Sequence, residues 1–384
     1  MKQVLIAADK FKGSLTTFEA CSHIENGIHS ADPTVKVKLF PVADGGDGFQ
    51  QVMQHYLDTK TIACDTVDPL HRPIRATYQL DPTSKTAIIE VAIASGLVLL
   101  KKEERDPLKT STIGTGLLIK DAILKGCTTI LLGLGGSATN DAGMGILHAL
   151  GFSYYAKDGQ SLEPCGESLE HIDEIEPPEI FYPVAFLIAC DVKNILHGKE
   201  GAAHVFAKQK GADDNSIRKL DAGLINFSNV IRKMTGKNVD QIPGTGAAGG
   251  IAAGLMAFFP VEIKSGIELV IDVSGMKQFM QTTDLVITGE GKMDEQTMTG
   301  KVIAGVLALA HHAGKPVIVC CGENTLDDVF LRSKGVVATF TLSERSSSVE
   351  DAIQNAGMRL EETAAAAIRW YINRPWTLMD RKRP

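Results

Sequence analysis

The sequence predicts an α/β protein of two domains, in which a parallel-sheet domain is interrupted by an inserted second α/β domain with a mixed sheet. Strand and helix patterns alternate at both ends of the chain, and between them lie a hairpin signal and several glycine-rich loops. With 384 residues the chain also exceeds the roughly 250–300 residues over which one core grows. The expected domains are residues 1–62 with 282–384, and the insert 63–281.

The first domain is expected to begin with a buried strand, because residues 4–8 form an apolar run. A helical pattern follows at 15–30, then a strand at 35–40 and a helix at 48–57. Apolar runs at 285–288, 316–320 and 336–341, separated by helical stretches, predict three more strands. Because strands joined by helices run parallel, both ends of the chain are expected in one sheet.

The insert shows a different pattern. Alternating segments at 75–80 and 86–91 flank the turn-forming pair Asp81-Pro82 and predict a hairpin. Apolar runs at 129–134 and 184–188 predict buried strands, each followed by a polar loop. These loops are where ligands are expected, because ligands of α/β proteins bind beyond the carboxyl ends of strands.

Composition excludes several classes of function. A net charge of -7 and a pI near 5.8 argue against nucleic acid as the main partner. No apolar run has the length of a signal-peptide core or of a membrane span. The seven cysteines include no C-x-x-C pair, which favours reduced thiols and a cytoplasmic protein. Neither a zinc-ligand spacing nor a G-x-S-x-G elbow is present.

Polar loops follow three predicted strands of the first domain. They contain Asp9, Lys10, Lys12 and Ser14; then Asp44, Gly45, Gly46 and Asp47; then Gly289, Glu290, Gly291, Asp294, Thr297 and Lys301. Each loop alone is also compatible with ordinary turn and N-cap chemistry. At one edge of one sheet, however, their carboxylates would repel one another without a cation. Magnesium with a phosphorylated ligand fits this arrangement.

The insert adds two glycine-rich loops. The first opens a helix, so its free N–H groups suit phosphate, and it contains Gly135, Gly136, Ser137, Thr139, Asn140 and Asp141. The second matches G-x-G-x-x-G and contains Gly244, Gly246, Gly249 and Gly250. Because no clear strand precedes it, close helix packing and a phosphate or adenine loop both stay open. A Walker-type P-loop is absent from the chain.

Asp191 follows the predicted strand at 184–188, and Asn194 lies three residues later. An acidic base with a nearby amide suits phosphoryl transfer, which depends on positioning the attacking hydroxyl. A helix N-cap at Asp191 is equally compatible with the sequence. The pair is therefore a candidate catalytic constellation.

Taken in order, these loops and Gln209-Lys210-Gly211 resemble those of the glycerate kinases of the bacterial glycerate 2-kinase type. The resemblance runs from residue 1 to about residue 340. It implies a two-domain protein with a Rossmann-like domain interrupted by an insert, and ATP-dependent phosphorylation of D-glycerate, which in this family typically gives 2-phosphoglycerate. The chain departs from the family pattern at Lys10, Asp47, Ile195 and Lys208.

The resemblance and the loop chemistry together give the residues expected roles in a cleft between the domains. Asp191 is the first candidate for the base at the 2-hydroxyl, and Asp294 is the second. Lys12 and Lys301 are candidates to contact the glycerate carboxylate or the transferring phosphate. Asp44, Asp47 and Asp294 are the expected magnesium ligands. The other loop residues are expected to bind ATP or glycerate.

Two other functions are compatible with part of the sequence. A nicotinamide-dependent dehydrogenase of a small hydroxy acid rests on the G-x-G-x-x-G match alone. A non-catalytic protein that binds a phosphorylated metabolite is the third reading. The surplus of acidic loops favours catalysis over this third reading. Each reading has small molecules as partners, without nucleic acid or membrane.

Overall fold

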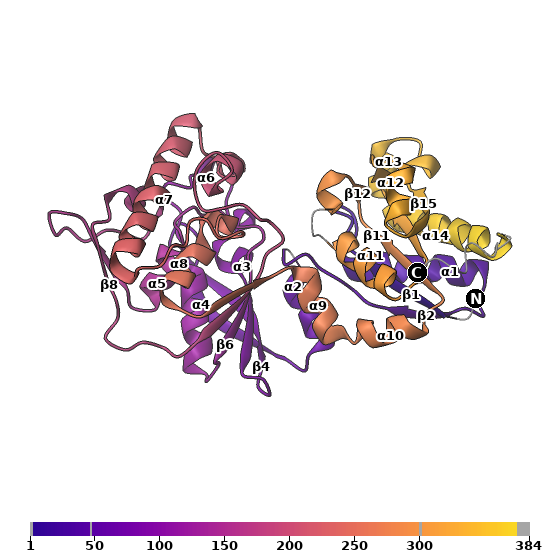
Figure 1. Cartoon of the computed structure of the whole chain (residues 1–384), viewed down its shortest axis with the longest axis horizontal. Coiled ribbons are helices and arrows are strands. Elements are labelled where there is room, and N and C mark those ends of the chain that lie inside the picture. The colour runs from indigo at the N-terminus through magenta and orange to yellow at the C-terminus, as the bar shows by residue number, and fades with distance from the viewer. Residues whose placement is uncertain (1–2, 47, 299–301, 375–384) are drawn as a thin grey trace. The chain divides into compact units, whose positions relative to one another are not determined.

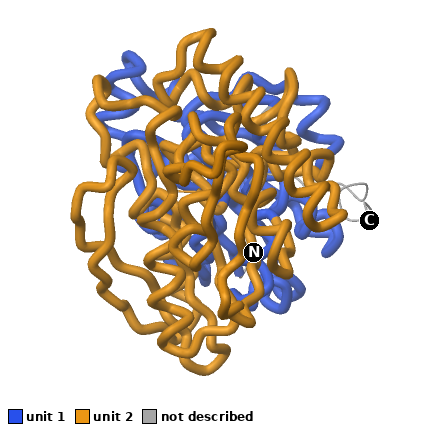
Figure 2. The backbone as a smooth tube through the Cα atoms, turned by 90° about the vertical axis from the view of Figure 1, so that its left-hand side faces the viewer, with its two compact units in different colours: residues 1–44, 265–384 blue, residues 45–264 orange. Residues whose placement is uncertain are grey.

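The structure is a computed structural model that describes residues 3–46, 48–298 and 302–374. The chain divides into two compact units (Figure 2). Unit 1 joins the two ends of the chain, Met1–Asp44 and Ser265–Pro384, and unit 2 is the intervening segment Gly45–Lys264. Both units are of the α/β class, with the elements labelled in Figure 1.

Unit 1 is built on a five-stranded sheet in which every neighbouring pair is parallel. The strand order is β15-β13-β11-β1-β2, with bounds β1 (Gln3–Ala8), β2 (Lys36–Leu39), β11 (Leu285–Gly289), β13 (Val317–Cys321) and β15 (Val336–Thr341). The N-terminal strand β1 pairs directly with β11 from the far end of the sequence. The prediction that both chain ends share one sheet is therefore confirmed.

Helices cover the sheet of unit 1, and their bounds are α1 (Thr17–Ala31), α9 (Gly266–Ser274), α10 (Met276–Thr282), α11 (Val302–His312), α12 (Asp328–Ser333), α13 (Val349–Gln354) and α14 (Ala356–Asn373). The α1 helix begins at a capping box, in which Thr16 and Glu19 bond each other's backbone N–H groups. Helices α1 and α14 pack on each other, and α1 also packs on β1 and α14 on β13. Helices α10 and α11 contact each other, and both contact β1. The central strands are consequently buried along their length.

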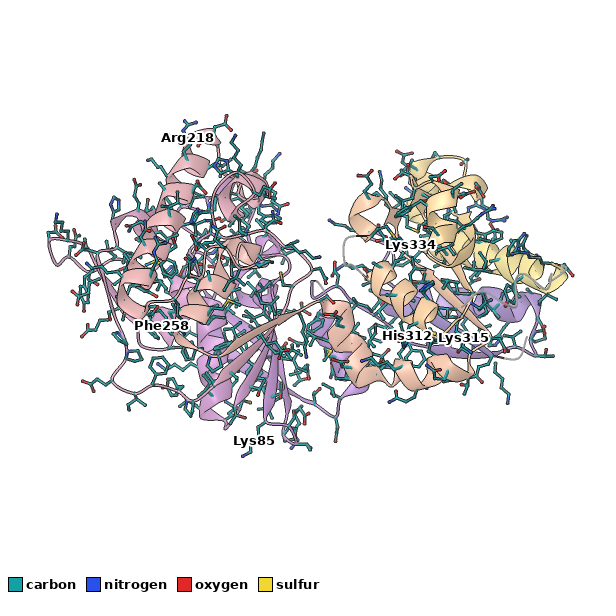
Figure 3. The ribbon with its side chains drawn as sticks, in the orientation of Figure 1. Lys85, Arg218, Phe258, His312, Lys315 and Lys334 are labelled. Atoms are coloured by element: carbon teal, nitrogen blue, oxygen red, sulfur yellow. The ribbon has the colours of Figure 1, made fainter. Side chains whose placement is uncertain are left out.

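Unit 2 is built on a six-stranded mixed sheet with the order β10-β9-β6-β5-β4-β3. Its strands are β3 (Lys60–Val67), β4 (Pro73–Asp81), β5 (Thr86–Glu90), β6 (Thr129–Gly133), β9 (Ala185–Ala189) and β10 (Val261–Lys264). The β4–β5 pair is the predicted antiparallel hairpin, and Lys85 at its turn has a φ of 53° (Figure 3). Strands β5, β6, β9 and β10 run parallel, so their carboxyl ends meet at one edge.

The helices of unit 2 are α2 (Phe49–Tyr56), α3 (Val91–Ser95), α4 (Ile113–Leu124), α5 (Met144–Ala149), α6 (Ala202–Phe206), α7 (Asp214–Thr235) and α8 (Ile251–Phe258). The longest, α7, is capped at its N-terminus by the Asp213 side chain and ends at Gly236, whose φ is 73°. Phe258, labelled in Figure 3, is the last residue of α8. Its ring packs against that of Phe152, with ring centroids 4.5 Å apart. A short antiparallel pair of strands, β7 (Ser153–Tyr155) and β8 (Glu174–Glu176), completes the unit.

The remaining short elements lie close to functional loops or surface turns. In unit 1 they are β12 (Lys292–Met293), β14 (Glu323–Asn324), η6 (Glu295–Met298) and η7 (Ser343–Arg345). In unit 2 they are η1 (Leu97–Leu99), η2 (Lys102–Glu104), η3 (Gly166–His171), η4 (Lys208–Lys210) and η5 (Ala247–Gly249). None of the helices in the described part of the chain combines the length and apolar character that crossing a bilayer requires.

The predicted fold class is confirmed, since a parallel-sheet unit is interrupted by a mixed-sheet unit. The units change at Asp44–Gly45 and Lys264–Ser265, earlier in both cases than the boundaries expected at 62 and 281. At the first boundary α2 packs on β4 and β5, because Phe49, Val52 and Met53 bury their side chains there. At the second, α9 and α10 pack with α11 of unit 1.

Candidate active site

In unit 1, three carboxylates lie at the carboxyl edge of the parallel sheet. Asp9 follows β1 and Glu290 follows the neighbouring β11, while Asp44 lies beyond β2. The Asp9 backbone N–H donates to Gly289 O at 2.8 Å, which fixes the ends of the two strands together. Lys10 Nζ lies 3.8 Å from Asp44 Oδ1. The structure thus brings the first, second and third predicted acidic loops to one edge.

Crowding of these carboxylates changes the acidity of Asp9. Its side chain is 8% exposed, and burial with the nearby charges of Asp44 and Glu290 raises its pKa from 3.8 to about 7. The backbone N–H and charge of Lys10 oppose this shift only in part. A bound cation would relieve the repulsion that raises the pKa.

The remaining predicted residues of unit 1 surround this edge. Lys12 is exposed, and its backbone N–H would lie 3.3 Å from a Cβ at Gly291. Ser14 Oγ donates to Phe11 O at 3.1 Å, closing the turn. Asp294 bonds reciprocally with Thr297: each backbone N–H donates to the other's side chain. Lys301 and Asp47 lie outside the described residues.

Close packing requires glycine at two positions beside the end of β11, Gly289 in the third loop and Gly322 after β13. A Cβ at Gly289 would lie 1.9 Å from Cys320 O, and the close approach of Gly291 to Gly322 leaves no room for a side chain on Gly322. These glycines let the end of β11 lie directly against β13. The ligand contacts predicted for Gly289 and Gly291 stay predictions, whereas a packing role is evident for Gly289.

In unit 2, the loop from Gly135 to Asp141 follows β6 and is held at several points. Leu97 N donates to Gly136 O at 2.9 Å and Ala138 N to Ser95 O at 2.8 Å. Thr110 Oγ1 donates to Ala138 O at 2.9 Å. The loop is thus held by two other segments of the chain, residues 95–97 and Thr110.

The backbone N–H groups of this loop are, by contrast, largely unused. Five of them donate to no acceptor within the described part of the chain, those of Gly136, Ser137, Thr139, Asn140 and Asp141. Thr139 Oγ1 and both polar atoms of the Asn140 amide are likewise buried without a partner among described residues. Because buried polar groups are normally hydrogen-bonded, the loop is built to bind a ligand or ordered water.

Asp141 anchors the loop to the helices that follow it. The side chain is fully buried and accepts hydrogen bonds from Thr112 N and Oγ1, Gly143 N and Gly145 N. Burial raises the Asp141 pKa, although these four hydrogen bonds oppose the shift. All four hydrogen bonds come from the protein itself, so the Asp141 carboxylate supports the structure of the loop.

The G-x-G-x-x-G loop packs against the first loop. A Cβ at Gly249 would lie 2.2 Å from Thr139 O, and one at Gly246 would lie 2.1 Å from Ile195 O. The N–H groups of Gly244 and Gly246 both donate to Asn194 O. A dinucleotide fingerprint requires a strand that leads directly into the loop, and here no strand does so. The small residues accordingly serve close packing, and Gly250 (φ 96°) begins α8.

Asp191 and Asn194 follow β9 at the same edge of the unit 2 sheet. Both are half-buried, and Asn194 Nδ2 donates to Glu200 O at 2.7 Å. Gly45 and Gly46 lie there too: Gly135 N donates to Gly45 O, and a Cβ at Gly135 would lie 2.3 Å from Gly46 Cα. Unit 2 therefore gathers these residues around the ends of β6 and β9.

Sequence reasoning missed two charged residues of this edge. Glu90 ends β5, is 6% exposed, and accepts a hydrogen bond from Gln50 N at 2.5 Å. Lys210 is 2% exposed and donates to the first glycine loop. A charged residue closing an apolar strand was the available signal for Glu90. Lys210 lay in a motif that was noticed but given no site role.

Within the described residues, no group of three or more His, Cys, Asp or Glu side chains is arranged to enclose a metal ion. Of the expected magnesium ligands, Asp44 lies in the acidic cluster and Asp294 is engaged with Thr297. Magnesium in kinases typically uses only one or two protein carboxylates, with water and phosphate oxygens completing its shell. The donor set at Asp44 fits that kind of site.

Two α/β units with polar loops at the carboxyl edges of parallel strands define an enzyme fold of the ligand-binding α/β type. Comparison with protein families makes the assignment specific. The model of the glycerate kinase family matches residues 4–372, and the chain belongs to that family. The resemblance seen in the sequence is confirmed.

Individual relatives agree with this assignment. The chain is 40% identical to a glycerate kinase of Halalkalibacterium halodurans, over 95% of this chain and 97% of that protein. It is 38% identical to glycerate 2-kinase of Escherichia coli K12, covering 92% and 94% of the two chains. A crystal structure described as glycerate kinase 2 from Salmonella typhimurium LT2 superposes with a TM-score of 0.82 at 35% identity, covering 97% and 98%. The protein is an enzyme with glycerate kinase activity.

Proposed function

We propose that the enzyme transfers the γ-phosphoryl group of ATP to the 2-hydroxyl of D-glycerate and releases 2-phosphoglycerate. The observation that carries this proposal is the set of five loop N–H groups, those of Gly136, Ser137, Thr139, Asn140 and Asp141, that have no acceptor among the described residues, next to the Thr139 and Asn140 side chains, which likewise have no partner there. Such a loop suits phosphate, because converging N–H groups bind anionic oxygens. The similarity to a glycerate 2-kinase supports the 2-hydroxyl as acceptor.

Magnesium would be held at Asp44, together with phosphate oxygens and water, and would neutralise phosphate charge during transfer. Burial is the main cause of the raised pKa of Asp9, and the charges of Asp44 and Glu290 add to it; this second contribution supports a cation at this edge. Lys10 beside Asp44 and the exposed Lys12 supply positive charge for an anionic substrate. Asp294 and Lys301 stay candidates for contacts with the transferring group.

Asp191 is the proposed general base. It lies at the carboxyl end of β9, where the polar loops of unit 2 gather, and part of its carboxylate is buried. A base in this position would accept the proton of the 2-hydroxyl as the oxygen attacks phosphorus. The proposal also includes a cytoplasmic location, in keeping with the free cysteines of the described chain.

One experiment tests activity and regiochemistry together. Purified enzyme is incubated with ATP, magnesium chloride and D-glycerate, and the products are identified by phosphorus NMR. The expected products are ADP and 2-phosphoglycerate, with no reaction when ATP or magnesium is omitted. Formation of 3-phosphoglycerate would overturn the regiochemistry, and turnover with NAD in place of ATP would favour a dehydrogenase.

A further inference from the structure

Lys210 is a buried cation beneath the first glycine loop, and the proposed function gives it no role. It ends the short helix η4, where its neighbour Lys208 is exposed. Its Nζ donates to Ser137 Oγ at 2.8 Å and to Thr139 O at 2.7 Å. Burying an ammonium is costly unless its contacts compensate, so an apolar side chain would be expected here if packing were the only requirement.

The acceptors of Lys210 are neutral oxygens of the loop itself. The carboxylate whose charge acts on Lys210 is Asp141, and Asp141 accepts four hydrogen bonds from other groups. The lysine therefore holds the loop itself, which the segment 95–97 also holds through its backbone. Ser137 and Thr139 are held between these two supports.

The chemistry of an ammonium fixes the direction of the bond to Ser137. An ammonium has donors only, so Ser137 Oγ must accept, and the hydroxyl hydrogen of Ser137 must point elsewhere. The described residues offer this hydrogen no acceptor. The unused N–H groups of Gly136, Ser137 and Thr139 lie in the same loop. Together they form a set of donors with no acceptor.

We propose that Lys210 is a positioning residue, which holds the Ser137 hydroxyl as a hydrogen-bond donor to an anionic oxygen of the bound ligand. That oxygen belongs either to a phosphate of ATP or to the carboxylate of glycerate. The proposal rests on the proposed function, because it takes the Gly135–Asp141 loop as part of the ligand site. Lys210 acts through Ser137 and does not contact the ligand.

Titration of Lys210 gives the arrangement a predicted pH dependence. Burial lowers the Lys210 pKa from 10.5 to about 7, and the charge of Asp141 opposes this shift. Above that pH the neutral amine can accept a hydrogen bond, so the Ser137 hydroxyl can turn inward. The contribution of Ser137 to ligand affinity is therefore expected to decrease as the pH rises through about 7.

A double-mutant cycle tests the coupling directly. ATP and D-glycerate are titrated separately, by calorimetry, into wild type, Ser137→Ala, Lys210→Met and the double variant. Each single substitution is expected to weaken one ligand by about ten- to a hundredfold, as for a hydrogen bond to a charged group. The double variant should be no weaker than the weaker single variant, because both remove the same interaction. If ATP binds more weakly, the oxygen that Ser137 contacts belongs to a phosphate; if D-glycerate binds more weakly, it belongs to the carboxylate.

Lys208→Met is the matched control, because it removes an exposed lysine from the same short helix and should leave both affinities unchanged. The proposal would be overturned if the affinity loss of the double variant equalled the product of the two single losses. It would also be overturned if Ser137→Ala bound both ligands as tightly as wild type. If Lys210→Met does not fold, the affinity ratio of wild type to Ser137→Ala is measured from pH 6 to 9. The ratio should fall with rising pH, and a constant ratio rejects the coupling.

Failure of the proposed function gives a different result. Wild type would then produce no phosphorylated glycerate from ATP, whereas the titrations, which need no turnover, would still report whether Ser137 and Lys210 act together. Conversely, normal turnover with uncoupled Ser137 and Lys210 would retain the proposed function and remove this inference.

Discussion

Asp191 is the residue whose replacement tests the proposed chemistry most directly. An Asp191→Asn substitution keeps the size of the side chain but removes the base, so kcat is expected to fall at least about a hundredfold. The measurement is steady-state turnover with saturating ATP and D-glycerate. Asp214→Asn, which alters an exposed carboxylate at the start of α7, should leave kcat unchanged. Near-normal turnover of folded Asp191→Asn would remove Asp191 from the role of base.

Asp9 makes the stability of the protein depend on pH in an unusual direction. Because its folded pKa is raised from 3.8 to about 7, its stabilising contribution is complete below about pH 4 and is lost as the pH rises through 7. Urea unfolding without metal or nucleotide should therefore show wild type losing stability relative to Asp9→Asn between pH 5 and 8, by a few kcal/mol.

The comparison has a matched control in Asp32→Asn. Asp32 is half-buried, and the hydrogen bonds that Thr34 donates to its carboxylate lower its pKa, so its contribution is lost only at pH values below its ordinary range. Asp32→Asn should parallel wild type from pH 5 to 8. A difference between wild type and Asp9→Asn that stays constant over this range would contradict the raised pKa of Asp9.

At the residue scale, sequence reasoning identified the acidic edge of unit 1 but not the supports of unit 2. Asp9, Asp44 and Glu290 were predictable because each follows a strand in a polar loop. Glu90 was not, because it is a single charge in an apolar run, and Lys210 was not, because nothing in the sequence separates it from the exposed Lys208 two residues earlier. Their supporting role is seen only from their burial and their hydrogen-bond partners, which exist only in the folded chain.

At the scale of elements, the packing of α1 on α14 predicts that Gly27→Ala destabilises the protein, whereas helix propensity alone predicts stabilisation. Alanine is favoured over glycine by about 1 kcal/mol inside a helix. A Cβ at Gly27, however, would lie 2.3 Å from Glu361 O and 2.9 Å from Ala364 Cβ. Gly27→Ala is expected to lower the free energy of unfolding by about 1–3 kcal/mol, as overpacking does.

Ser22→Ala is the control for this substitution, since Ser22 is exposed on the same helix. It should change the free energy of unfolding by less than about 0.5 kcal/mol. Urea denaturation of both variants gives the comparison. Stabilisation by Gly27→Ala would show that α14 can move away from α1 without cost.

The two glycine-rich loops of unit 2 look alike in sequence, yet their backbone groups are used differently. In the Gly244–Gly250 loop, Gly244, Thr245, Gly246 and Ala247 donate their N–H groups to nearby carbonyls. In the Gly135–Asp141 loop, most N–H groups have no acceptor in the described chain. Glycine spacing was compatible with both outcomes, and only the hydrogen-bond partners separate a supporting loop from a binding loop.

At the scale of the whole molecule, unit 2 is an insertion whose ends lie close together. Gly45 approaches Ala189 closely, and Cys190 N donates to Lys264 O at 2.9 Å, so both ends meet beside β9. Unit 2 also has its own hydrophobic core. Residues 45–264 expressed alone are expected to fold, with one cooperative urea transition and a dispersed amide NMR spectrum.

The N-terminal piece of unit 1 provides the contrasting control. Residues 1–44 should not fold alone, because β1 pairs with β11 from the other end of the chain and α1 packs on α14. Far-UV circular dichroism distinguishes the two fragments. A molten or aggregated 45–264 fragment would mean that unit 2 needs unit 1 to complete its core.

The sequence by itself determined the α/β class, the shared sheet of the two chain ends, the hairpin and the loops that carry polar residues. These features follow from local periodicity and from turn chemistry, which neighbouring residues encode. Only the tertiary structure decided where the units divide, which glycine loop keeps its N–H groups open, and that Glu90 and Lys210 support the loops. Those features depend on burial and on hydrogen-bond partners distant in sequence, which no local pattern specifies.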